Sequence, residues 1–294
     1  MRVVNLSGDD WFYEKLYDHV STVMSIDEII YKGNSGCQDL MLFRNKFWGK
    51  VLTLDGVIQL TETDEFIYHE MIVHVPMMSH NNPRHALVIG GGDGGVVREL
   101  LKYNSIVSVT LVEIDSDVID FTKEYLGSVC GDSFSDPRLH VIVDDGANFV
   151  RMSSSKEGFD IAIVDSTDPR GVGEVLFSDD FHSDLKKCLR SGGIAVSQNG
   201  VAFCQREQMA KSADIFRSLY GKHSFYSAMV PTYVMGPMML GFMSDVVEYH
   251  SMNIAVLRDR FSRYGIYTKY YTPEMHISSF TLPAYLKGAL NITI

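Results

Sequence analysis

The sequence predicts an α/β protein in which a small antiparallel β domain precedes a larger domain built on a doubly wound, mostly parallel sheet. Short strand-like runs with turn residues between them occupy residues 26–60. From residue 84 onward, apolar strands alternate with amphipathic helices, which is typical of a parallel sheet covered by helices on both faces. With 294 residues, 46% of them hydrophobic, the chain is long enough for such a core. We expect domains at residues 1–61 and 62–294.

The predicted β domain contains four strand-like runs. They span residues 26–33, 38–45, 47–55 and 56–61. The pair Asp55-Gly56 is typical of a two-residue hairpin turn. We expect a small antiparallel sheet of up to six strands. From Thr61, a threonine cap followed by acidic residues predicts a helix to about Met78, which connects the two domains.

The larger domain is predicted from five strands and the helices between them. The strands are residues 85–90, 107–114, 139–145, 159–166 and 192–199. The helices are residues 94–103, 116–126, 147–153, 179–190 and 205–220. Open parallel sheets bind ligands at the carboxyl ends of their strands. We therefore expect the functional residues directly after Ile89, Val112, Val143, Val164 and Val196.

A glycine-rich turn follows the first of these strands. It reads Gly90-x-Gly92-x-x-Gly95, a fingerprint in which glycines let the backbone approach a ligand at a helix N-terminus. Glu113, at the end of the next strand, can accept hydrogen bonds from two ribose hydroxyls. The two features together indicate an adenosine-containing ligand in a Rossmann-like domain. A tight turn without a ligand is the alternative interpretation.

Carboxylates mark the other strand ends. Asp145, followed by Gly146, can accept from an adenine amino group or cap the next helix, and the sequence favours neither. Asp165 and Asp168 lie on one loop with no evident capping or ion-pair role, which favours a functional one. Asp93 stands at the centre of the glycine turn, although such a turn usually receives an anion.

Composition excludes several classes of function. The formal net charge of −11 argues against binding to nucleic acid. No apolar run is long enough to span a membrane and no secretory signal is evident, so we expect a cytoplasmic protein. A zinc motif beginning at His69 fails because Val73 stands where the second histidine belongs. The spacing of the four cysteines suggests neither a disulfide framework nor a metal site: Cys37, Cys130, Cys188 and Cys204.

The segments GGGDGG, LVEID, DDG and DSTDPRGVGEVLF together resemble the spermidine synthase family of polyamine aminopropyltransferases. The segments QDL, LDGVIQ, EFIYHEM and PTY are similar to family segments in the family order, so the resemblance covers nearly the whole chain. It implies a methyltransferase-like sheet and transfer of an aminopropyl group from decarboxylated S-adenosylmethionine to putrescine, giving spermidine and methylthioadenosine. The donor is a co-substrate, and neither a cofactor nor a metal is implied. Homodimers or homotetramers are expected.

The resemblance also implies roles for individual residues. Asp165 matches the catalytic aspartate. Residues that match the nucleoside site are Gln38, Leu54, Glu113, Asp145 and Gly146. Residues that match the polyamine channel or lie beside it are Gln59, Tyr68, His69, Asp168 and Tyr233. The glycine turn contributes Gly90, Gly92 and Asp93. Val172 stands where the family usually has a proline, so it departs from the family pattern near the donor site.

The implied donor explains why Asp93 stands in the glycine turn. Decarboxylation leaves an ammonium, without a carboxylate, at the amino-acid end of the donor. A carboxylate at Asp93 attracts that ammonium and repels the carboxylate of the intact donor. At about 4 Å and an effective dielectric constant of about 20, each interaction is on the order of 4 kcal/mol before desolvation. We therefore interpret Asp93 as a residue that selects the donor.

Three other functions account for parts of this pattern. A nicotinamide-dependent dehydrogenase accounts for the glycine turn and Glu113 but leaves Asp93 unexplained. A methyltransferase acting on putrescine would use the intact donor, which Asp93 opposes. A polyamine-binding protein without catalysis would not need Asp165. Within the aminopropyltransferases, cadaverine, agmatine and spermidine stay open as acceptors, and Asp165 can take the proton directly or through water.

Overall fold

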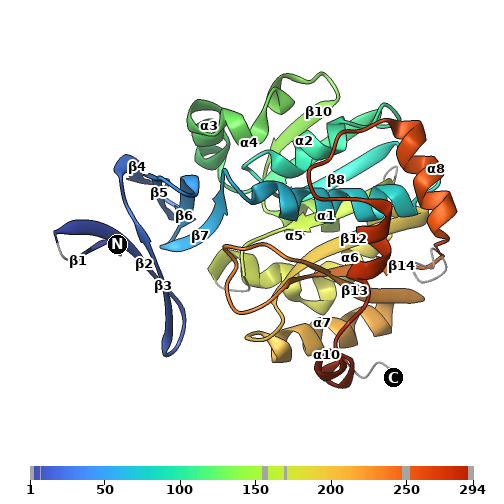
Figure 1. The fold of residues 1–294 in the computed structure, drawn as a ribbon. Helices are drawn as coiled ribbons and strands as arrows, with labels where there is room; N and C mark the ends of the chain where they lie inside the picture. The colour runs from blue at the N-terminus through green and yellow to red at the C-terminus, as the bar shows by residue number, and fades with distance from the viewer. Residues whose placement is uncertain (1–2, 7, 154–157, 169–170, 247–251, 291–294) are drawn as a thin grey trace.

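The computed structural model describes residues 3–6, 8–153, 158–168, 171–246 and 252–290. A β-rich N-terminal domain lies beside a larger α/β domain, and helix α1 (Glu65–Ser79) runs from one into the other (Figure 1). The predicted fold class, a mostly parallel sheet preceded by a small antiparallel β domain, is confirmed.

The N-terminal domain contains two antiparallel sheets. The first consists of β1 (Val3–Leu6), β2 (Asp9–Tyr17) and β3 (Val20–Ser25). The second consists of β4 (Glu28–Asn34), β5 (Asp39–Asn45), β6 (Gly49–Leu54) and β7 (Val57–Thr61). The predicted hairpin turn between β6 and β7 is confirmed, since Asp55 and Gly56 have φ angles of 50° and 73°. The prediction of one sheet was wrong, because residues 3–25 form a sheet of their own.

Helix α1 begins three residues later than a threonine cap at Thr61 would place it. Asp64 occupies the N-cap position without a capping hydrogen bond, and Thr61 Oγ1 donates to Asp64 Oδ1 at 2.6 Å. The predicted threonine cap was therefore wrong. Nearly all of α1 is buried between the sheet and neighbouring helices, so its polar side chains need partners inside the protein. These buried polar side chains include Glu65, His69, Glu70 and His74.

A seven-stranded sheet forms the centre of the larger domain, in the order β10-β9-β8-β11-β12-β14-β13. Its strands are β8 (His85–Gly90), β9 (Ser108–Glu113), β10 (Leu139–Val143), β11 (Phe159–Asp165), β12 (Leu189–Val201), β13 (Lys222–Ala228) and β14 (Met238–Ser244). The five predicted strands pair in parallel, as expected, and β13 and β14 add an antiparallel edge. The strand order reverses between β8 and β11, which opens a crevice at their carboxyl ends.

Helices cover both faces of this sheet, as Figure 1 shows. Besides α1 they are α2 (Gly95–Leu101), α3 (Ser116–Tyr125), α4 (Gly127–Cys130), α5 (Gly146–Ser153), α6 (Asp179–Cys188), α7 (Arg206–Leu219), α8 (Ile254–Tyr264), α9 (Pro273–Ser279) and α10 (Ala284–Ala289). One core joins the sheet to α1, α2 and α8, with Ile72, Val97 and Leu257 fully buried. The opposite core joins it to α5, α6, α7 and α10. The doubly wound arrangement follows from these two cores.

The N-terminal domain is fixed against the larger domain by apolar packing. Side chains of the second sheet, including Leu42 and Leu52, pack with Phe121 of α3 and Val129 of α4. Lys50 Nζ adds a hydrogen bond to the carbonyl oxygen of Tyr125 at 2.7 Å. This contact holds the second sheet over the carboxyl ends of the parallel strands, where the crevice lies.

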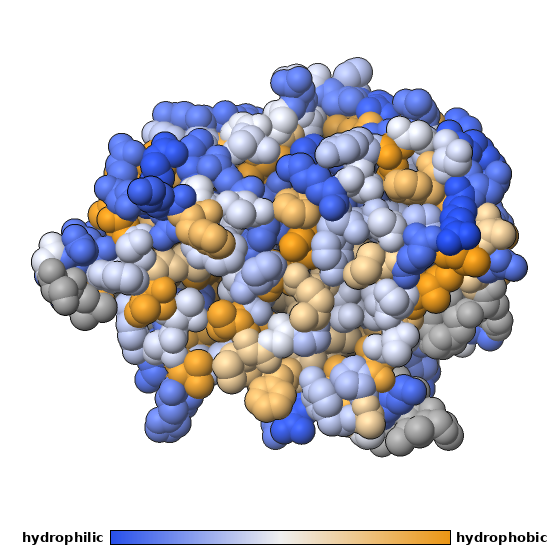
Figure 2. Space-filling model, viewed as in Figure 1, coloured by the Kyte–Doolittle hydropathy of each residue, from blue (hydrophilic) through white to orange (hydrophobic). Residues whose placement is uncertain are grey.

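The outer surface is mixed in polarity. Figure 2 shows hydrophilic residues over the upper part of the visible face and hydrophobic residues interspersed below them. Within the described residues, every helix is too short or too polar to cross a bilayer.

Candidate active site

A cavity of about 210 Å³ lies at the carboxyl ends of β8, β9 and β11 and reaches the N-terminal domain. All of the residues predicted for the site line this one cavity, with the exception of Val172. The side chain of Val172 lies outside the described part of the chain. The crevice at the reversal of strand order therefore brings together residues separated by nearly 200 positions, from Gln38 to Tyr233.

The glycine turn after β8 lies directly against the end of β11. Gly90 and Gly91 have φ angles of 77° and 72°, which favour glycine. A Cβ atom on Gly90 would come within 2.1 Å of the carbonyl oxygen of Asp165, and one on Gly91 within 3.0 Å of Asp165 Oδ2. The absence of side chains on the turn thus lets Asp165 sit next to it.

Backbone donors hold Glu113 at the end of β9. Gly92 N donates to Glu113 Oε2 at 3.1 Å, and Asp115 N donates to Oε1 at 3.0 Å. Burial raises the pKa of Glu113 to about 7, and the charge of Asp115 adds to the effect. Asp115 Oδ2 also accepts a hydrogen bond from Gln38 Nε2 at 3.1 Å, which ties the N-terminal domain to this strand end.

Asp145 fulfils one of the two roles that the sequence left open, the cap of the next helix. Its Oδ1 accepts hydrogen bonds from Ala147 N at 2.7 Å and Asn148 N at 3.2 Å, which caps the start of α5. The same residue lines the cavity beside Gly146. A Cβ on Gly146 would come within 2.3 Å of Ile89 Cγ2, so glycine is needed there for close packing. A contact between Asp145 and adenine stays a prediction.

Asp93 forms an ion pair with His69 inside the cavity wall. His69 Nε2 lies 3.4 Å from Asp93 Oδ1, and His69 Nδ1 lies 2.5 Å from Glu65 Oε2. Burial opposes protonation, but Asp93 and Glu65 outweigh it and raise the pKa of His69 to about 10. Gly95 N also donates to Asp93 Oδ1, at 2.7 Å. Asp93 is consequently held as a carboxylate at the centre of the glycine turn.

Asp165 has one engaged carboxylate oxygen and one without a partner. Tyr68 donates its hydroxyl to Asp165 Oδ1 at 2.7 Å. Asp165 Oδ2 is buried and, among the described residues, lacks a hydrogen-bond partner. Burial, and then the negative charge of Asp93, raises the pKa of Asp165 to about 6. A buried acceptor of this kind indicates a place for a donor group from a ligand.

Two tyrosines and an amide shape another part of the wall. The rings of Tyr68 and Tyr233 meet edge to face, with their centroids 6.1 Å apart, and the Tyr233 hydroxyl donates to the carbonyl oxygen of Gln59. Asp168 Oδ1 accepts a hydrogen bond from Gln198 Nε2 at 3.2 Å. These residues supply aromatic surface and a second carboxylate to the wall of the cavity.

Sequence reasoning missed several lining residues, including Glu14 and Gln198. Glu14 is 4% exposed, and its Oε1 accepts a hydrogen bond from Ile58 N at 2.8 Å. The sequence gives no signal for Glu14, because its burial beside Phe12 on β2 becomes visible only in the structure. Gln198 follows the apolar part of β12 and carries no signal either. Its role depends on Asp168, 30 residues earlier.

His69, Asp93 and Asp165 each offer one possible metal-ligand atom, and these atoms lie within 4.8 Å of one another. A histidine binds a metal through a neutral nitrogen. His69 is instead held as an imidazolium between two carboxylates, so the cluster suits an organic cation better than a metal ion. That the reaction needs no metal stays a prediction.

Comparison with known proteins identifies the family. A family model of the spermine/spermidine synthase domain matches residues 65–253, and one of the spermidine synthase tetramerisation domain matches residues 10–62. The chain is 44% identical to a polyamine aminopropyltransferase of Pectobacterium carotovorum over 97% of its own length and 99% of the relative's. It is 45% identical to one from a Ruegeria species, over 96% and 99% of the two chains.

Solved structures agree with this result. The fold matches a spermidine synthase crystallised with the transition-state analogue AdoDATO, with a TM-score of 0.91 and 33% identity over 96% of this chain and 95% of the other. It matches the spermidine synthase of Thermotoga maritima with a TM-score of 0.88 and 32% identity, over 96% and 94% of the two chains. Sequence and structure therefore lead to one conclusion: the chain belongs to the spermine/spermidine synthase family and is an aminopropyltransferase.

Proposed function

We propose that this aminopropyltransferase transfers the aminopropyl group of decarboxylated S-adenosylmethionine to putrescine, giving spermidine and methylthioadenosine. The observation that carries the proposal is the carboxylate pair formed by Asp93 and Asp165, both half-buried in one cavity beside the glycine turn. Asp93 stands where the amino-acid end of the donor is expected. It attracts a donor that carries an ammonium there and repels one that also carries a carboxylate.

The nucleoside end of the cavity suits the rest of this donor. Both Glu113 oxygens are oriented by backbone donors, and each has a further lone pair for a ribose hydroxyl. Because burial holds the pKa of Glu113 at about 7, hydrogen bonds from the two hydroxyls would favour its ionised form. Gln38 and Asp145 complete the polar groups at this end.

The acceptor is proposed to be a diamine because carboxylates also line the part of the cavity beyond Asp165. Asp168 and Glu14 each supply a negative charge, and Tyr68 and Tyr233 offer aromatic surface to the chain between two amines. A diamine enters as a dication and is matched by these groups. Putrescine is proposed as that diamine from the family resemblance, while cadaverine and agmatine are tested as competitors.

In the transfer step, a neutral amine of the acceptor attacks the propyl carbon bonded to the donor's sulfonium. A nitrogen–carbon bond forms while the carbon–sulfur bond breaks, and the electron pair of that bond goes to sulfur, which leaves as the neutral thioether of methylthioadenosine. An alkyl amine with a pKa near 10.4 must first lose a proton, at a cost of about 4 to 5 kcal/mol at pH 7. Asp165 Oδ2 is the proposed acceptor, directly or through water.

Product analysis tests this proposal. Purified protein is incubated with putrescine and either the decarboxylated or the intact donor, and the products are identified by mass spectrometry. Spermidine and methylthioadenosine should form from the decarboxylated donor alone. Methylputrescine from the intact donor would refute the role of Asp93, and preferential use of cadaverine or agmatine would refute putrescine as acceptor.

We also propose that the chain assembles into homodimers or homotetramers through its N-terminal sheets. The match of residues 10–62 to a tetramerisation domain supports this proposal. Light scattering coupled to size-exclusion chromatography should give two or four times the chain mass of 33.1 kDa. A monomer at micromolar concentration would contradict it.

A further inference from the structure

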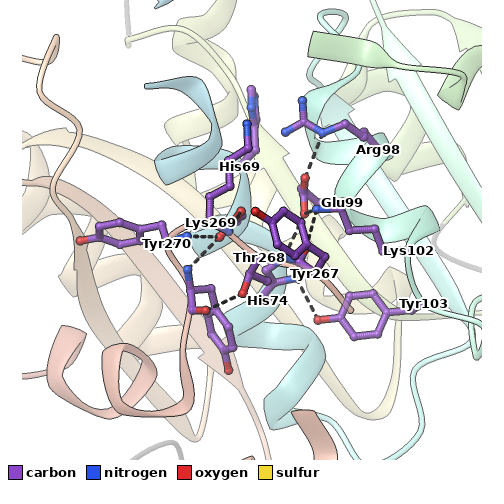
Figure 3. A network of polar contacts seen from close by, with 12 residues as sticks. His69, His74, Arg98, Glu99, Lys102, Tyr103, Tyr267, Thr268, Lys269 and Tyr270 are labelled. Carbon is purple, nitrogen blue, oxygen red and sulfur yellow. Dashed lines mark hydrogen bonds and ion pairs between the residues drawn. The ribbon is translucent and has the colours of Figure 1, made fainter. Parts of the chain in front are cut away.

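Two glutamate–histidine contacts lie on either side of one arginine. Arg98 on α2 contacts Glu65 through Nη1 at 3.0 Å and Nη2 at 2.9 Å, and it contacts Glu99 through Nε at 2.9 Å. Glu65 then pairs with His69, while Glu99 pairs with His74 at 3.0 Å. Figure 3 shows that Glu99 lies between Arg98 and His74, and that His69 lies on the same helix as His74. Both glutamates are buried, at 6% and 1% exposure.

The two pairs end in different surroundings. His74 Nδ1 meets the buried hydroxyl of Tyr103 at 2.9 Å, inside the apolar core. His69 Nε2 meets Asp93 at 3.4 Å, on the wall of the cavity. The glutamate–histidine contact on one side of Arg98, Glu99 with His74, therefore lies wholly inside the core. The contact on the other side, Glu65 with His69, reaches the active site.

We propose that Glu65, clamped by Arg98, is a positioning residue for aminopropyl transfer: it holds the His69 ring so that Nε2 is directed at Asp93 and fixes the Asp93 carboxylate in the cavity. The inference rests on the proposed function in that it assigns Asp93 to the donor's ammonium. Glu65 is suited to this role because its carboxylate contacts His69 and Arg98 at the same time. Oε2 faces His69 Nδ1, and both oxygens accept from the planar guanidinium of Arg98.

The neighbouring backbone also leaves room for the His69 ring in its observed position. A Cβ on Gly95, the first residue of α2, would come within 2.3 to 2.5 Å of three atoms of the His69 ring. The third glycine of the fingerprint thus leaves space for this histidine. The ring of Tyr68 packs against His69 edge to face, with centroids 5.5 Å apart. Support from Gly95, Tyr68 and Glu65 leaves the ring one orientation, with Nε2 toward Asp93.

The charged groups around His69 explain how Glu65 keeps this histidine protonated. Glu65 lies on the same helix, Asp93 on the glycine turn and Asp165 at the end of β11, while Arg98 approaches Glu65 from α2. Because His69 and Arg98 outweigh the effect of burial, the pKa of Glu65 lies below its usual value and the carboxylate stays ionised. An ionised Glu65 keeps His69 protonated, and a protonated His69 can donate to Asp93.

The test compares Glu65→Gln with Glu99→Gln, which makes the same change to the other partner of Arg98. In Glu65→Gln, the pKa of His69, followed by NMR of isotope-labelled histidine, should fall by about one unit or more. The value of kcat/KM for the decarboxylated donor should fall about tenfold. Glu99→Gln should leave the His69 titration unchanged and keep kcat/KM within about twofold of the value for the unmodified enzyme. This should hold even if Glu99→Gln lowers thermal stability as much as Glu65→Gln does.

An unchanged His69 titration in Glu65→Gln, or an equal loss of kcat/KM in Glu99→Gln, would overturn the inference. If Glu65→Gln does not fold, Arg98→Lys keeps the charge but loses the paired hydrogen bonds to Glu65, and both readouts should move in the same direction. Unchanged readouts in Arg98→Lys would equally overturn it. The product assay of the unmodified enzyme separates the two proposals: failure there removes the proposed function, whereas the comparison of glutamates tests the role of Glu65.

Discussion

The hydroxyl of Tyr68 on α1 donates to Oδ1 of Asp165 at the end of β11, at a distance of 2.7 Å. This bond fixes the carboxylate while leaving Oδ2 without a partner among the described residues. It also acts on ionisation: burial and Asp93 raise the pKa of Asp165, whereas the Tyr68 hydrogen bond lowers it. Tyr68 therefore orients the proposed base and limits how far its pKa rises.

Removing this hydroxyl should shift the pH dependence of the reaction. In Tyr68→Phe the pKa of Asp165 rises above its present value of about 6, so ionised Asp165 is lost at higher pH. The acid limb of kcat/KM, which reports on the free enzyme, should move up by about one pH unit. Tyr226→Phe is the control, since the buried Tyr226 hydroxyl donates to the carbonyl oxygen of Met71 in the core. An acid limb that stays in place in Tyr68→Phe would contradict the assignment.

The two aspartates of the β11 loop should differ in kinetic effect. Asp165→Asn removes the proposed base and should lower kcat by about 100-fold or more. Asp168→Asn keeps a hydrogen-bonding group beside Gln198 but removes a charge, so it should chiefly raise KM for putrescine, by about tenfold. Steady-state kinetics with both substrates varied separate these effects. Equal losses of kcat in the two variants would show that Asp165 has no distinct role.

The close packing of the His69 ring against Gly95 can be tested by adding one methyl group at Gly95. In Gly95→Ala the new Cβ would overlap the His69 ring, so we expect a loss of about 1 to 3 kcal/mol in unfolding free energy and reduced activity. Gly127→Ala is the matched control, because a Cβ there meets nothing within 4 Å. Its stability should be unchanged or slightly higher. Denaturant unfolding of both variants makes the comparison, and a neutral Gly95→Ala would contradict the observed packing.

The paired His69 also predicts a pH dependence of stability. Its folded-state pKa of about 10 lies above the ordinary value of 6.5, so the folded protein binds an extra proton between these limits. The stabilisation is complete below about pH 6.5 and is lost as pH rises toward 10, with a slope of at most about 1.4 kcal/mol per pH unit. Unfolding free energies measured between pH 7 and 9 should fall less steeply in His69→Asn. Identical slopes would rule out the paired imidazolium.

The chemistry at the strand ends was predictable because parallel strands bring their carboxyl ends to one edge. Glu113 and Asp165 end the strands on either side of β8, and each lies against the glycine turn in the structure. The predicted position of the Val172 side chain near the donor site stays a prediction. The family resemblance supplied residues such as Gln38 and Tyr233, which local patterns do not place near the others.

Contacts between distant elements were not predictable. Glu14 looks like an exposed strand residue until β2 packs against β7 and buries it at Ile58. The clamp on Glu65 needs α2 to bring Arg98 beside α1, 33 residues away in sequence. The β13–β14 edge likewise depends on pairing with β12 rather than on the alternation of strands and helices.

Donor selection by Asp93 is the central claim, and the ratio of kcat/KM for the decarboxylated and intact donors tests it most directly. The ratio is measured with putrescine for the unmodified enzyme and for Asp93→Asn, which keeps the size of the side chain. We predict that the unmodified enzyme strongly prefers the decarboxylated donor and that Asp93→Asn lowers the ratio about 100-fold. A ratio unchanged by Asp93→Asn would contradict the claim.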